Sequence, residues 1–424
     1  MIDMYKLVLP MKLNQKYFSI VLIFLSLNSH QSFAAGYSTN LTSTSGLGNI
    51  YAGSVTGIHD VSDMFFNPAI TSGLKHKEFI ASVSYVDIKI DPDNVSGRFS
   101  NGTQATGTEV KNAGTNKLVP ALYLATPIND KIAFGLSITS PFGLSTKYDK
   151  NWIGRYHAVE SSITTYNINP SLSYKINEKL SVGAGVQAQY LEALLTKAVR
   201  TSGADAIGRL HGSDWGYGYN FGVSYQANDQ LKLAIGYRSK IDYKIICVTQ
   251  VADLGLYSDF HAETTTPESA TIGAAFKLNK KIELAYDGTW TRWSRLQSIV
   301  ANAHQDSRLN YKADFNWHDS FLHSFGANFT LNDTWLIRSG IAYEKDATSN
   351  STREPRVPTG DRVSVGLGFN YKITKGLSVD TAYVHQFYKN AKVNITDSTT
   401  TVNSLEARYK TKVNVFSVAL KKEF

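Results

Sequence analysis

The strongest constraint in the sequence is a repeated alternation of large apolar residues with small or polar ones. From Trp215 to Gln226, Trp, Tyr, Phe and Val occupy one phase, and Gly, Asn, Ser and Gln occupy the other. The same period of two recurs in residues 231–243 and 363–371. Because successive side chains of a strand point to opposite faces, each segment predicts a β-strand with one apolar face. Such a face suits the core of a large soluble β protein or the lipid-facing wall of a membrane barrel.

The connections between these strands alternate between short and long. Short polar turns are predicted at 128–130, 177–179, 227–230, 279–281, 332–334 and 373–376. Long polar connections are predicted near 91–116, 141–161, 196–214, 244–267, 294–308, 344–361 and 388–412. Six short and seven long connections join fourteen strands, with both chain ends on the side of the short turns. This layout is typical of bacterial outer-membrane barrels, whereas a soluble sandwich gives no reason to gather the long loops at one end.

Composition separates a barrel from a helical membrane protein. Of the 424 residues, 18% are charged and 12% aromatic, and the mean hydropathy is -0.21. A membrane helix needs about 20 consecutive apolar residues, and the sequence has no such run outside its N-terminus. The last strand carries Phe416, Val418, Leu420 and the terminal Phe424 on one phase, which suits closure against the first strand. We therefore predict an all-β, 14-stranded antiparallel transmembrane β-barrel.

Residues 1–34 have the three parts of a secretory signal peptide. Lys12 and Lys16 form the positive region, residues 18–27 form the apolar core, and Ser32-Phe33-Ala34 provides a small-x-small cleavage site. Cleavage is expected after Ala34. Together with the barrel, this segment predicts export and multi-pass insertion into the bacterial outer membrane with the help of the barrel assembly machinery.

The next segment, residues 35–76, is predicted to be a hatch inside a barrel formed by residues 77–424. It is rich in small residues and contains Ser45-Gly46-Leu47-Gly48 and Asn67-Pro68-Ala69. Gly permits close backbone packing, and Pro after Asn fixes a turn. A compact segment without a strand period, placed ahead of the strands, is expected to fold in the lumen. A static plug is the alternative to a hatch that moves.

Charge, cysteine content and missing motifs argue against several other functions. The formal net charge is +8 without a clustered basic run, which disfavours nucleic-acid binding. Cys247 alone cannot form an intramolecular disulfide or a Cys-based zinc site, and we predict neither a metal site nor a cofactor. The sequence has no Gly-x-Ser-x-Gly, His-Glu-x-x-His or phosphate-loop motif, so no catalytic residue is assigned. His157, His318 and His323 are interpreted as loop or wall residues.

Several motifs, taken in order and spacing, resemble the FadL/TodX family of outer-membrane transporters for long-chain fatty acids and other hydrophobic compounds. They include Ser45-Gly46-Leu47-Gly48, Asn67-Pro68-Ala69, Pro127-Ile128-Asn129-Asp130, Trp215-Gly216-Tyr217-Gly218 and Tyr237-Arg238-Ser239. The resemblance implies capture of a ligand from outside, binding in a hydrophobic lumen, and sideways release through a gap in the wall. It places this gap at a kink of the third strand beside Asn67, Pro68 and Ala69, at Pro141-Phe142-Gly143. An ordinary strand end before a loop is the alternative.

A lysine ends an apolar stretch on the lumen phase of the strand that begins at Leu180. This phase carries Leu191, Ala193 and Leu195 and then Lys197. The resemblance aligns Lys197 with a cationic carboxylate-binding position that is an arginine in the family. A lysine is a point charge and not a bidentate fork, so carboxylate recognition would be less exacting.

Lys312 is the second candidate cation. It is predicted to face the lumen, because Tyr311, Phe315, Trp317 and the phenylalanines at 321, 325 and 329 share the opposite phase. The resemblance places it within one residue of the family's second cationic position, and Leu195, Leu210 and Tyr37 would contact the ligand beside the two lysines. Binding would displace Tyr37 and loosen the hatch around Asn67. Solvated pore charge is the alternative for either lysine.

We therefore predict an outer-membrane transporter for long-chain fatty acids, without enzymatic activity. Uptake of neutral aromatic hydrocarbons and an outer-membrane lipid-active enzyme are the alternatives. The hatch and the apolar lumen disfavour an open porin, whereas an adhesin role of the long loops is compatible with transport. Expected partners are hydrophobic small molecules and outer-membrane lipids, and the protein is expected to be a monomer.

Overall fold

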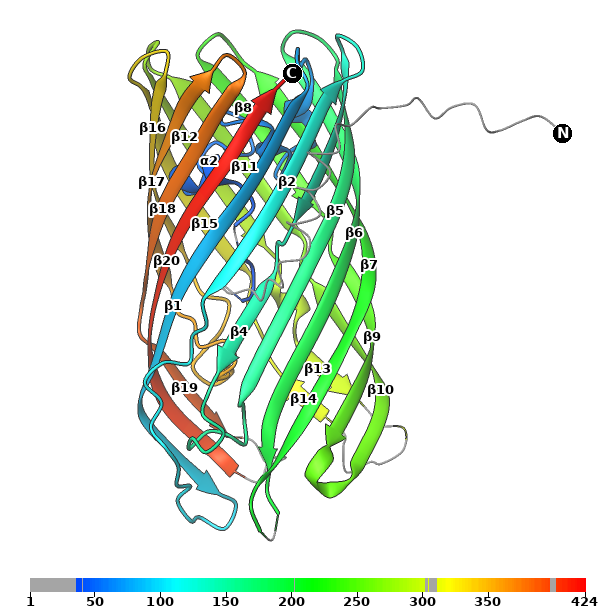
Figure 1. Cartoon of the computed structure of the whole chain (residues 1–424), viewed down its shortest axis with the longest axis vertical. Helices are drawn as coiled ribbons and strands as arrows, with labels where there is room; N and C mark the ends of the chain where they lie inside the picture. The colour runs from blue at the N-terminus through cyan, green and yellow to red at the C-terminus, as the bar shows by residue number, and fades with distance from the viewer. Residues whose placement is uncertain (1–35, 40, 202, 302–303, 305–310, 397–401) are drawn as a thin grey trace, which may run out of the picture.

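The computed structural model describes residues 36–39, 41–201, 203–301, 304, 311–396 and 402–424 (Figure 1). The predicted signal peptide, residues 1–34, lies outside these ranges. Within them the chain forms a closed antiparallel β-barrel of fourteen wall strands, which confirms the predicted fold class. No helix of the described residues is long and apolar enough to cross a membrane.

Twenty strand segments make up the wall. They are β1 (Glu78–Phe99), β2 (Lys117–Pro127), β3 (Ile132–Thr139), β4 (Gly143–Lys147), β5 (Glu160–Lys175), β6 (Leu180–Val199), β7 (Ala206–Gln226), β8 (Leu231–Arg238), β9 (Ile241–Val251), β10 (Leu256–Thr266), β11 (Ser269–Lys277), β12 (Ile282–Thr291), β13 (Ser298–Ala301), β14 (Tyr311–Asp314), β15 (Ser320–Thr330), β16 (Trp335–Glu344), β17 (Arg362–Thr374), β18 (Leu377–Tyr388), β19 (Ala391–Thr396) and β20 (Val402–Glu423). Six wall strands consist of two segments each: β3 with β4, β8 with β9, β10 with β11, β12 with β13, β14 with β15, and β18 with β19.

The first and last strands close the barrel. β1 runs antiparallel to β20 from Glu78↔Glu423 to Phe99↔Val402, and its first half also pairs with β2. Each wall strand therefore has a partner on both sides in the described chain. Closure matters in lipid, because an unpaired backbone group in the hydrocarbon region costs several kcal/mol.

The short turns follow from one residue type. In five of them, Asn129, Asn177, Asn228, Asn279 and Asn332 each accept, through Oδ1, the backbone N–H groups of the residues two and three positions ahead. Such side-chain to backbone bonds let asparagine replace a backbone turn. The sixth turn uses Gly376 at φ 80°, a conformation that glycine adopts without a steric cost.

The predicted apolar phase faces outward. In β7, Tyr217 is 74% exposed, whereas Gly222 on the other phase is buried. Outward apolar side chains continue around the wall at Val186, Ile272, Phe325, Leu367 and Phe416. These side chains form the lipid-facing belt of a transmembrane barrel.

The residues ahead of β1 form the hatch, which lies inside the barrel (Figure 1). It contains α2 (Thr44–Gly48) and the 3-10 helices η1 (Val61–Phe65) and η2 (Pro68–Thr71). Two further 3-10 helices lie in the wall: η3 (Ala252–Leu254) connects β9 to β10, and η4 (Trp293–Arg295) lies in the break between β12 and β13. Asn67 caps η2 by accepting the N–H of Ala69 at 2.9 Å. Asn as N-cap and Pro at the first helical position explain why Asn67-Pro68-Ala69 starts a helix here.

Lumen-facing glycines allow the hatch to approach the wall. A Cβ built on Gly222 of β7 would lie 2.0 Å from Oδ1 of Asn67, and one on Gly183 of β6 would lie 2.5 Å from the nitrogen of Ala69. A Cβ on Gly236 of β8 would meet a hatch carbonyl oxygen at 2.0 Å. Any side chain at these positions would displace the hatch.

Candidate ligand-binding lumen and hatch

The first described residues pair with the break in the third wall strand. β3 ends at Thr139 and β4 begins at Gly143, and both pair with β5. Across the break, the N–H of Thr39 donates to the Pro141 carbonyl at 3.0 Å, and the N–H of Gly143 donates to the Tyr37 carbonyl at 2.7 Å. Pro141 has no N–H to donate to a ladder. The wall segment that leaves the sheet therefore takes the hatch as its hydrogen-bonding neighbour.

Tyr37 packs in an aromatic cluster at this break. Its side chain is 4% exposed, and its ring centroid lies 5.8 Å from Phe142, 5.0 Å from Trp293 and 6.0 Å from Trp317. Burial raises the pKa of the Tyr37 hydroxyl, which stays neutral. Because Phe142 belongs to the broken wall strand, movement of Tyr37 would remove packing from the wall.

This cluster corrects the phase predicted for residues 311–329. Phe315 and Trp317 are buried with Tyr37, whereas Phe321 points outward and is 52% exposed. β14 and β15 are separated by residues 315–319, with Asn316 at φ 47°. The prediction that one phase continues through this stretch was wrong, because the strand is interrupted.

Because the strand is interrupted, the phase of residues 315–329 does not show which way Lys312 faces. Its backbone lies in β14 opposite Val300 of β13. Its side chain lies outside the residues that the structure describes. An inward orientation of this lysine therefore stays a prediction.

Lys197, Leu195 and Leu210 lie on one face of β6 and β7. In the antiparallel register Leu195 lies opposite Leu210, and Lys197 opposite Gly208. Leu210 packs against a buried apolar cluster that consists of Leu191, Ile241, Tyr243, Ile245, Cys247, Phe260 and Ala262. The face that carries the lysine therefore continues into an apolar lining. Tyr37 belongs to a different buried cluster. Of the four predicted ligand contacts whose side chains the structure describes, Lys197, Leu195 and Leu210 therefore lie together and Tyr37 lies apart.

Asn67 joins three parts of the structure. Its Nδ2 donates to the carbonyl of Val55 in the hatch at 2.7 Å and to the carbonyl of Val223 in β7 at 3.2 Å. Its Oδ1 accepts the N–H of Ala69. Pro68 and Ala69 then pack over the lumen glycines of the wall. This side chain thus fixes the hatch against β7.

A wall carboxylate provides a second anchor for the hatch. Asp287 of β12 accepts the N–H of Gly53 at 3.0 Å and that of Val55 at 2.9 Å. Each of these two bonds satisfies a backbone N–H group that would otherwise be buried without a partner. The turn at residues 53–55 is therefore attached both to the wall, through Asp287, and to Asn67, through the Val55 carbonyl.

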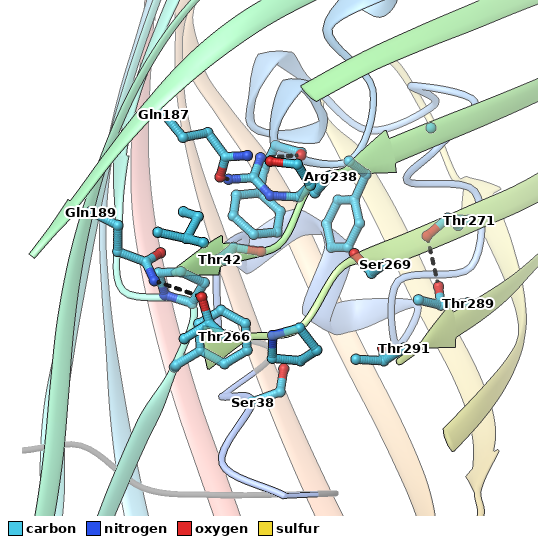
Figure 2. A pocket seen from close by; sticks show the side chains of 18 residues that line it. Ser38, Thr42, Gln187, Gln189, Arg238, Thr266, Ser269, Thr271, Thr289 and Thr291 are labelled. Atoms are coloured by element: carbon cyan, nitrogen blue, oxygen red, sulfur yellow. Dashed lines mark hydrogen bonds between the residues drawn. The ribbon is translucent and has the colours of Figure 1, made fainter. Parts of the chain in front are cut away.

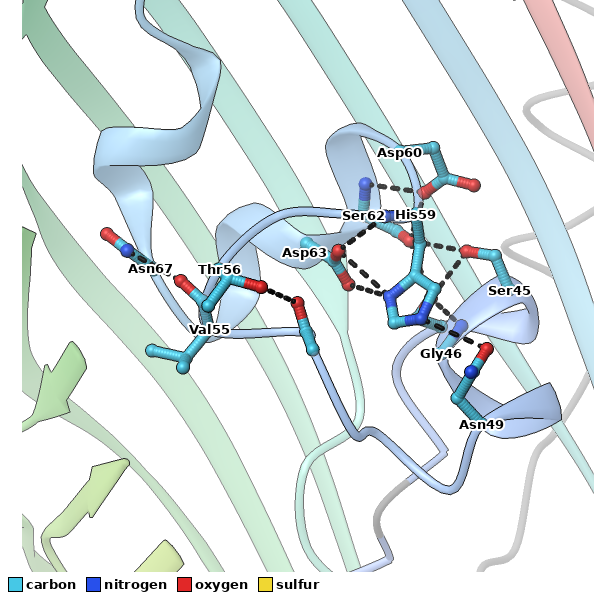
Figure 3. A network of polar contacts seen from close by, with 12 residues as sticks. Ser45, Gly46, Asn49, Val55, Thr56, His59, Asp60, Ser62, Asp63 and Asn67 are labelled. Carbon is cyan, nitrogen blue, oxygen red and sulfur yellow. Dashed lines mark hydrogen bonds and ion pairs between the residues drawn. The ribbon is translucent and has the colours of Figure 1, made fainter. Parts of the chain in front are cut away.

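A polar network holds the hatch helices together (Figure 3). His59 Nδ1 lies 3.0 Å from Oδ2 of Asp63, and its Nε2 lies 3.2 Å from Oδ1 of Asn49, the C-cap of α2. Asp60 caps η1 by accepting the N–H of Ser62 at 3.0 Å. Burial raises the pKa of Asp63, and His59 beside it acts in the opposite direction. The network links α2 to η1 as one unit.

Sequence reasoning missed Arg238, which lines a cavity of about 70 Å³ between the hatch and the wall (Figure 2). The sequence indicated this residue only as part of the motif Tyr237-Arg238-Ser239. The alternation of the strands could have indicated it. Arg238 lies on the lumen-facing phase of residues 231–243, and Gln187 and Gln189 lie on the lumen-facing phase of β6. All three line the same cavity.

Comparison with known proteins places this geometry in a family. Residues 25–424 match the model of the family described as outer membrane protein transport protein (OMPP1/FadL/TodX). The chain belongs to this family. Outer membrane protein P1 of Haemophilus influenzae (strain ATCC 51907 / DSM 11121 / KW20 / Rd) is 27% identical over 431 residues, covering 91% of this chain and 93% of that protein. The long-chain fatty acid transport protein of Escherichia coli (strain K12) is 26% identical over 424 residues, covering 89% and 93%.

Solved structures agree with the fold of the family. A Pseudomonas aeruginosa FadL homologue has a TM-score of 0.85 at 26% identity, covering 92% of this chain and 100% of that chain. The Ralstonia pickettii toluene transporter TbuX has a TM-score of 0.65 at 18% identity, covering 92% and 99%, and shares the fold. The protein is thus a FadL-family transmembrane barrel that transports hydrophobic compounds, its homologues are outer-membrane proteins, and the family consists of transport proteins and not of enzymes.

Proposed function

We propose that this protein takes up long-chain fatty acids from outside the cell, binds them in its lumen and releases them sideways through the wall. The observation that carries the proposal is Lys197 at the end of the apolar lining that includes Leu191, Leu195 and Leu210. A fatty acid uses an apolar surface for its chain and a cation for its carboxylate, because an unpaired charge in a dry site is costly. A neutral hydrocarbon uses only the apolar surface. The relatives named as long-chain fatty acid transport proteins support the same ligand class.

Ligand binding by the purified, refolded protein tests this proposal. We expect oleate to bind more tightly than oleyl alcohol or toluene, and Lys197→Ala to weaken oleate binding about tenfold or more, since a hydrogen bond to a charged group contributes about 1.5–3 kcal/mol. Lys312→Ala is expected to act in the same direction if that lysine is the second cation. Lys150→Ala, an exposed loop lysine, is the matched control. Unchanged oleate affinity in the double variant Lys197→Ala, Lys312→Ala would contradict the assignment, and equal binding of toluene would favour a hydrocarbon channel.

The proposed exit is the break at Phe142 and Gly143, with Tyr37 and the turn at Asn67, Pro68 and Ala69 as the moving parts. Displacement of Tyr37 by ligand would break its hydrogen bond with Gly143 and loosen the hatch. A disulfide between Ser38→Cys and Phe142→Cys, which form a β-bridge, would lock this contact. We expect the oxidised protein to bind oleate without transporting it and the reduced protein to recover uptake. Normal uptake by the oxidised protein would show that release follows another route.

We propose that residues 1–34 are a signal peptide that is removed, that residues 35–76 form the hatch and that residues 77–424 form the barrel. Intact mass of the protein from outer membranes should correspond to a chain that starts at Ala35. Light scattering in detergent should give one chain per particle. A larger mass would contradict cleavage after Ala34, and a larger particle would contradict the monomer.

A further inference from the structure

Arg238 is a lumen cation that is surrounded by neutral acceptors. Its Nη1 donates to the carbonyl of Phe65 at 2.9 Å and to Oδ1 of Asn169 at 3.2 Å. Its Nη2 donates to Oδ1 of Asn167 at 3.3 Å and to Oε1 of Gln187. The guanidinium carbon lies 3.9 Å from the centroid of the Phe65 ring. The hatch and the wall together therefore orient the guanidinium without neutralising it.

No carboxylate within the described ranges forms an ion pair with Arg238. Other buried arginines of the lumen are paired, Arg338 with Asp380 and Arg362 with Glu344. Arginine stays protonated in proteins, and a charge away from water is costly without a counter-charge. The contrast indicates that the missing counter-charge at Arg238 belongs to a ligand.

The cavity beside Arg238 is suited to a small polar group. At about 70 Å³ it exceeds several-fold the roughly 10–15 Å³ that one water needs. Hydroxyl side chains line much of it, at Ser38, Thr42, Ser239, Thr266, Ser269, Thr271, Thr289 and Thr291 (Figure 2). The remaining lining includes Pro141 and Phe142 of the wall break and Ile241 of the apolar cluster. The cavity therefore lies between the apolar lining and the proposed exit.

The Arg238 cavity is separate from the Lys197 site. Gln187, which accepts a hydrogen bond from Arg238, precedes Lys197 by ten residues in β6. This separation corresponds to about 33 Å along a strand at about 3.3 Å per residue. One carboxylate cannot contact both cations, so two positions exist for the headgroup of a ligand that moves through the lumen.

We propose that Arg238 is a second carboxylate subsite, which holds the fatty-acid headgroup at the inner end of the lumen next to the wall break. The inference rests on the proposed function for the identity of the anion. The carboxylate supplies the counter-charge of the guanidinium, and the amides of Asn167 and Gln187 keep the guanidinium in place. Ser38 lines the cavity and forms a β-bridge with Phe142, so displacement of Ser38 by the headgroup would open this bridge. Arrival of the ligand is thereby coupled to opening of the contact between the hatch and the wall break.

Calorimetric titration and uptake measurements test the subsite. Wild type is expected to bind two oleate molecules per chain, and Arg238→Met to lose one of them while the affinity of the remaining site changes less than about twofold. Oleate uptake by cells carrying Arg238→Met is expected to fall about tenfold or more, with partial recovery in Arg238→Lys, which keeps the charge but not the fork. Phe65→Leu is the matched control, because it weakens the same contact with the hatch and leaves the charge in place.

Two results would overturn the subsite and leave the proposed function intact: unchanged stoichiometry and uptake in Arg238→Met, or an equal loss in Phe65→Leu, which would make Arg238 a hatch anchor only. If wild type does not prefer oleate to oleyl alcohol, the proposed function fails. In that case, bromide soaked into crystals tests whether Arg238 binds an anion. Anomalous density beside Arg238 in wild type but not in Arg238→Met supports an anion subsite, and its absence in wild type refutes one.

Discussion

The contact between Gly222 and Asn67 predicts that one added methyl group will release the hatch. In Gly222→Ala the new Cβ would lie 2.0 Å from Oδ1 of Asn67, far inside the contact distance of about 3.5 Å. Asn67 would have to move by more than 1 Å, roughly the shortfall between these distances, and its bonds to Val55, Val223 and Ala69 would be lost. Three hydrogen bonds at about 1 kcal/mol each give about 3 kcal/mol. The strand itself accepts alanine, so the barrel should stay folded.

Hydrogen exchange of the hatch amides measures this effect. A cost of about 3 kcal/mol corresponds to an increase of about a hundredfold in the exchange of residues 53–69. Gly208→Ala in the same strand is the matched control, because the nearest atom to its Cβ is a side-chain methyl of Val199 at 3.1 Å. The reasoning would be refuted if hatch protection in Gly222→Ala equalled that of wild type, or if Gly208→Ala lost as much.

Three further substitutions address the anchors of the hatch and the wall. Asp287→Asn should lower the protection of residues 53–55 by about 1–2 kcal/mol, because the amide has one acceptor oxygen where the carboxyl uses two, one for each N–H group. Unchanged exchange there would contradict the anchor. Tyr37→Phe should leave the near-ultraviolet circular dichroism of the aromatic cluster intact. Tyr37→Ala should destabilise the cluster by about 3–5 kcal/mol, because the packing of the ring is lost. Equal effects of the two substitutions would show that the hydroxyl group matters and not the ring. Arg338→Met should lower the free energy of unfolding in urea by about 3–5 kcal/mol, since it leaves Asp380 buried and unpaired, and adding Asp380→Asn should recover part of the loss.

The wall could be predicted from the sequence because one rule governs most of it. Lipid on one side and a packed lumen on the other impose a period of two on every strand, as in β7 from Trp215 to Gln226. The short turns were equally readable, since asparagine at one position supplies both hydrogen bonds of the turn. The hatch was readable only as a segment without that period. Its docking on Gly183, Gly222 and Gly236 follows from tertiary contacts that no local pattern contains.

The candidate site was predicted less completely. Phase counting placed Leu195 and Lys197 on one face of β6, whereas Leu210 came only from the family resemblance, and the register of β6 with β7 brings it opposite Leu195. Phase counting misplaced Phe315 and Trp317, because it assumed an uninterrupted strand from residue 311 to 329. Arg238 was overlooked for another reason. A single lumen arginine is informative only once its neighbours prove to be amides and not carboxylates, and those neighbours come from β5, β6 and the hatch.

The two-residue period fails where wall strands are interrupted, and these interruptions lie close to Arg238 and Tyr37. Four neighbouring wall strands break at the same level, where Arg238, Ser269, Thr291 and Ser320 are successive partners across the sheet. Trp293 and Trp317 come from these breaks and pack on Tyr37, which contacts the separate break in the third wall strand at Phe142. Residues released from the two-residue period can turn into the lumen, whereas a continuous strand would point half of them at lipid. Tyr37, Phe142 and Arg238, for which we propose gating and binding roles, therefore lie where the pattern that builds the wall stops, whereas Lys197 lies within the continuous strand β6.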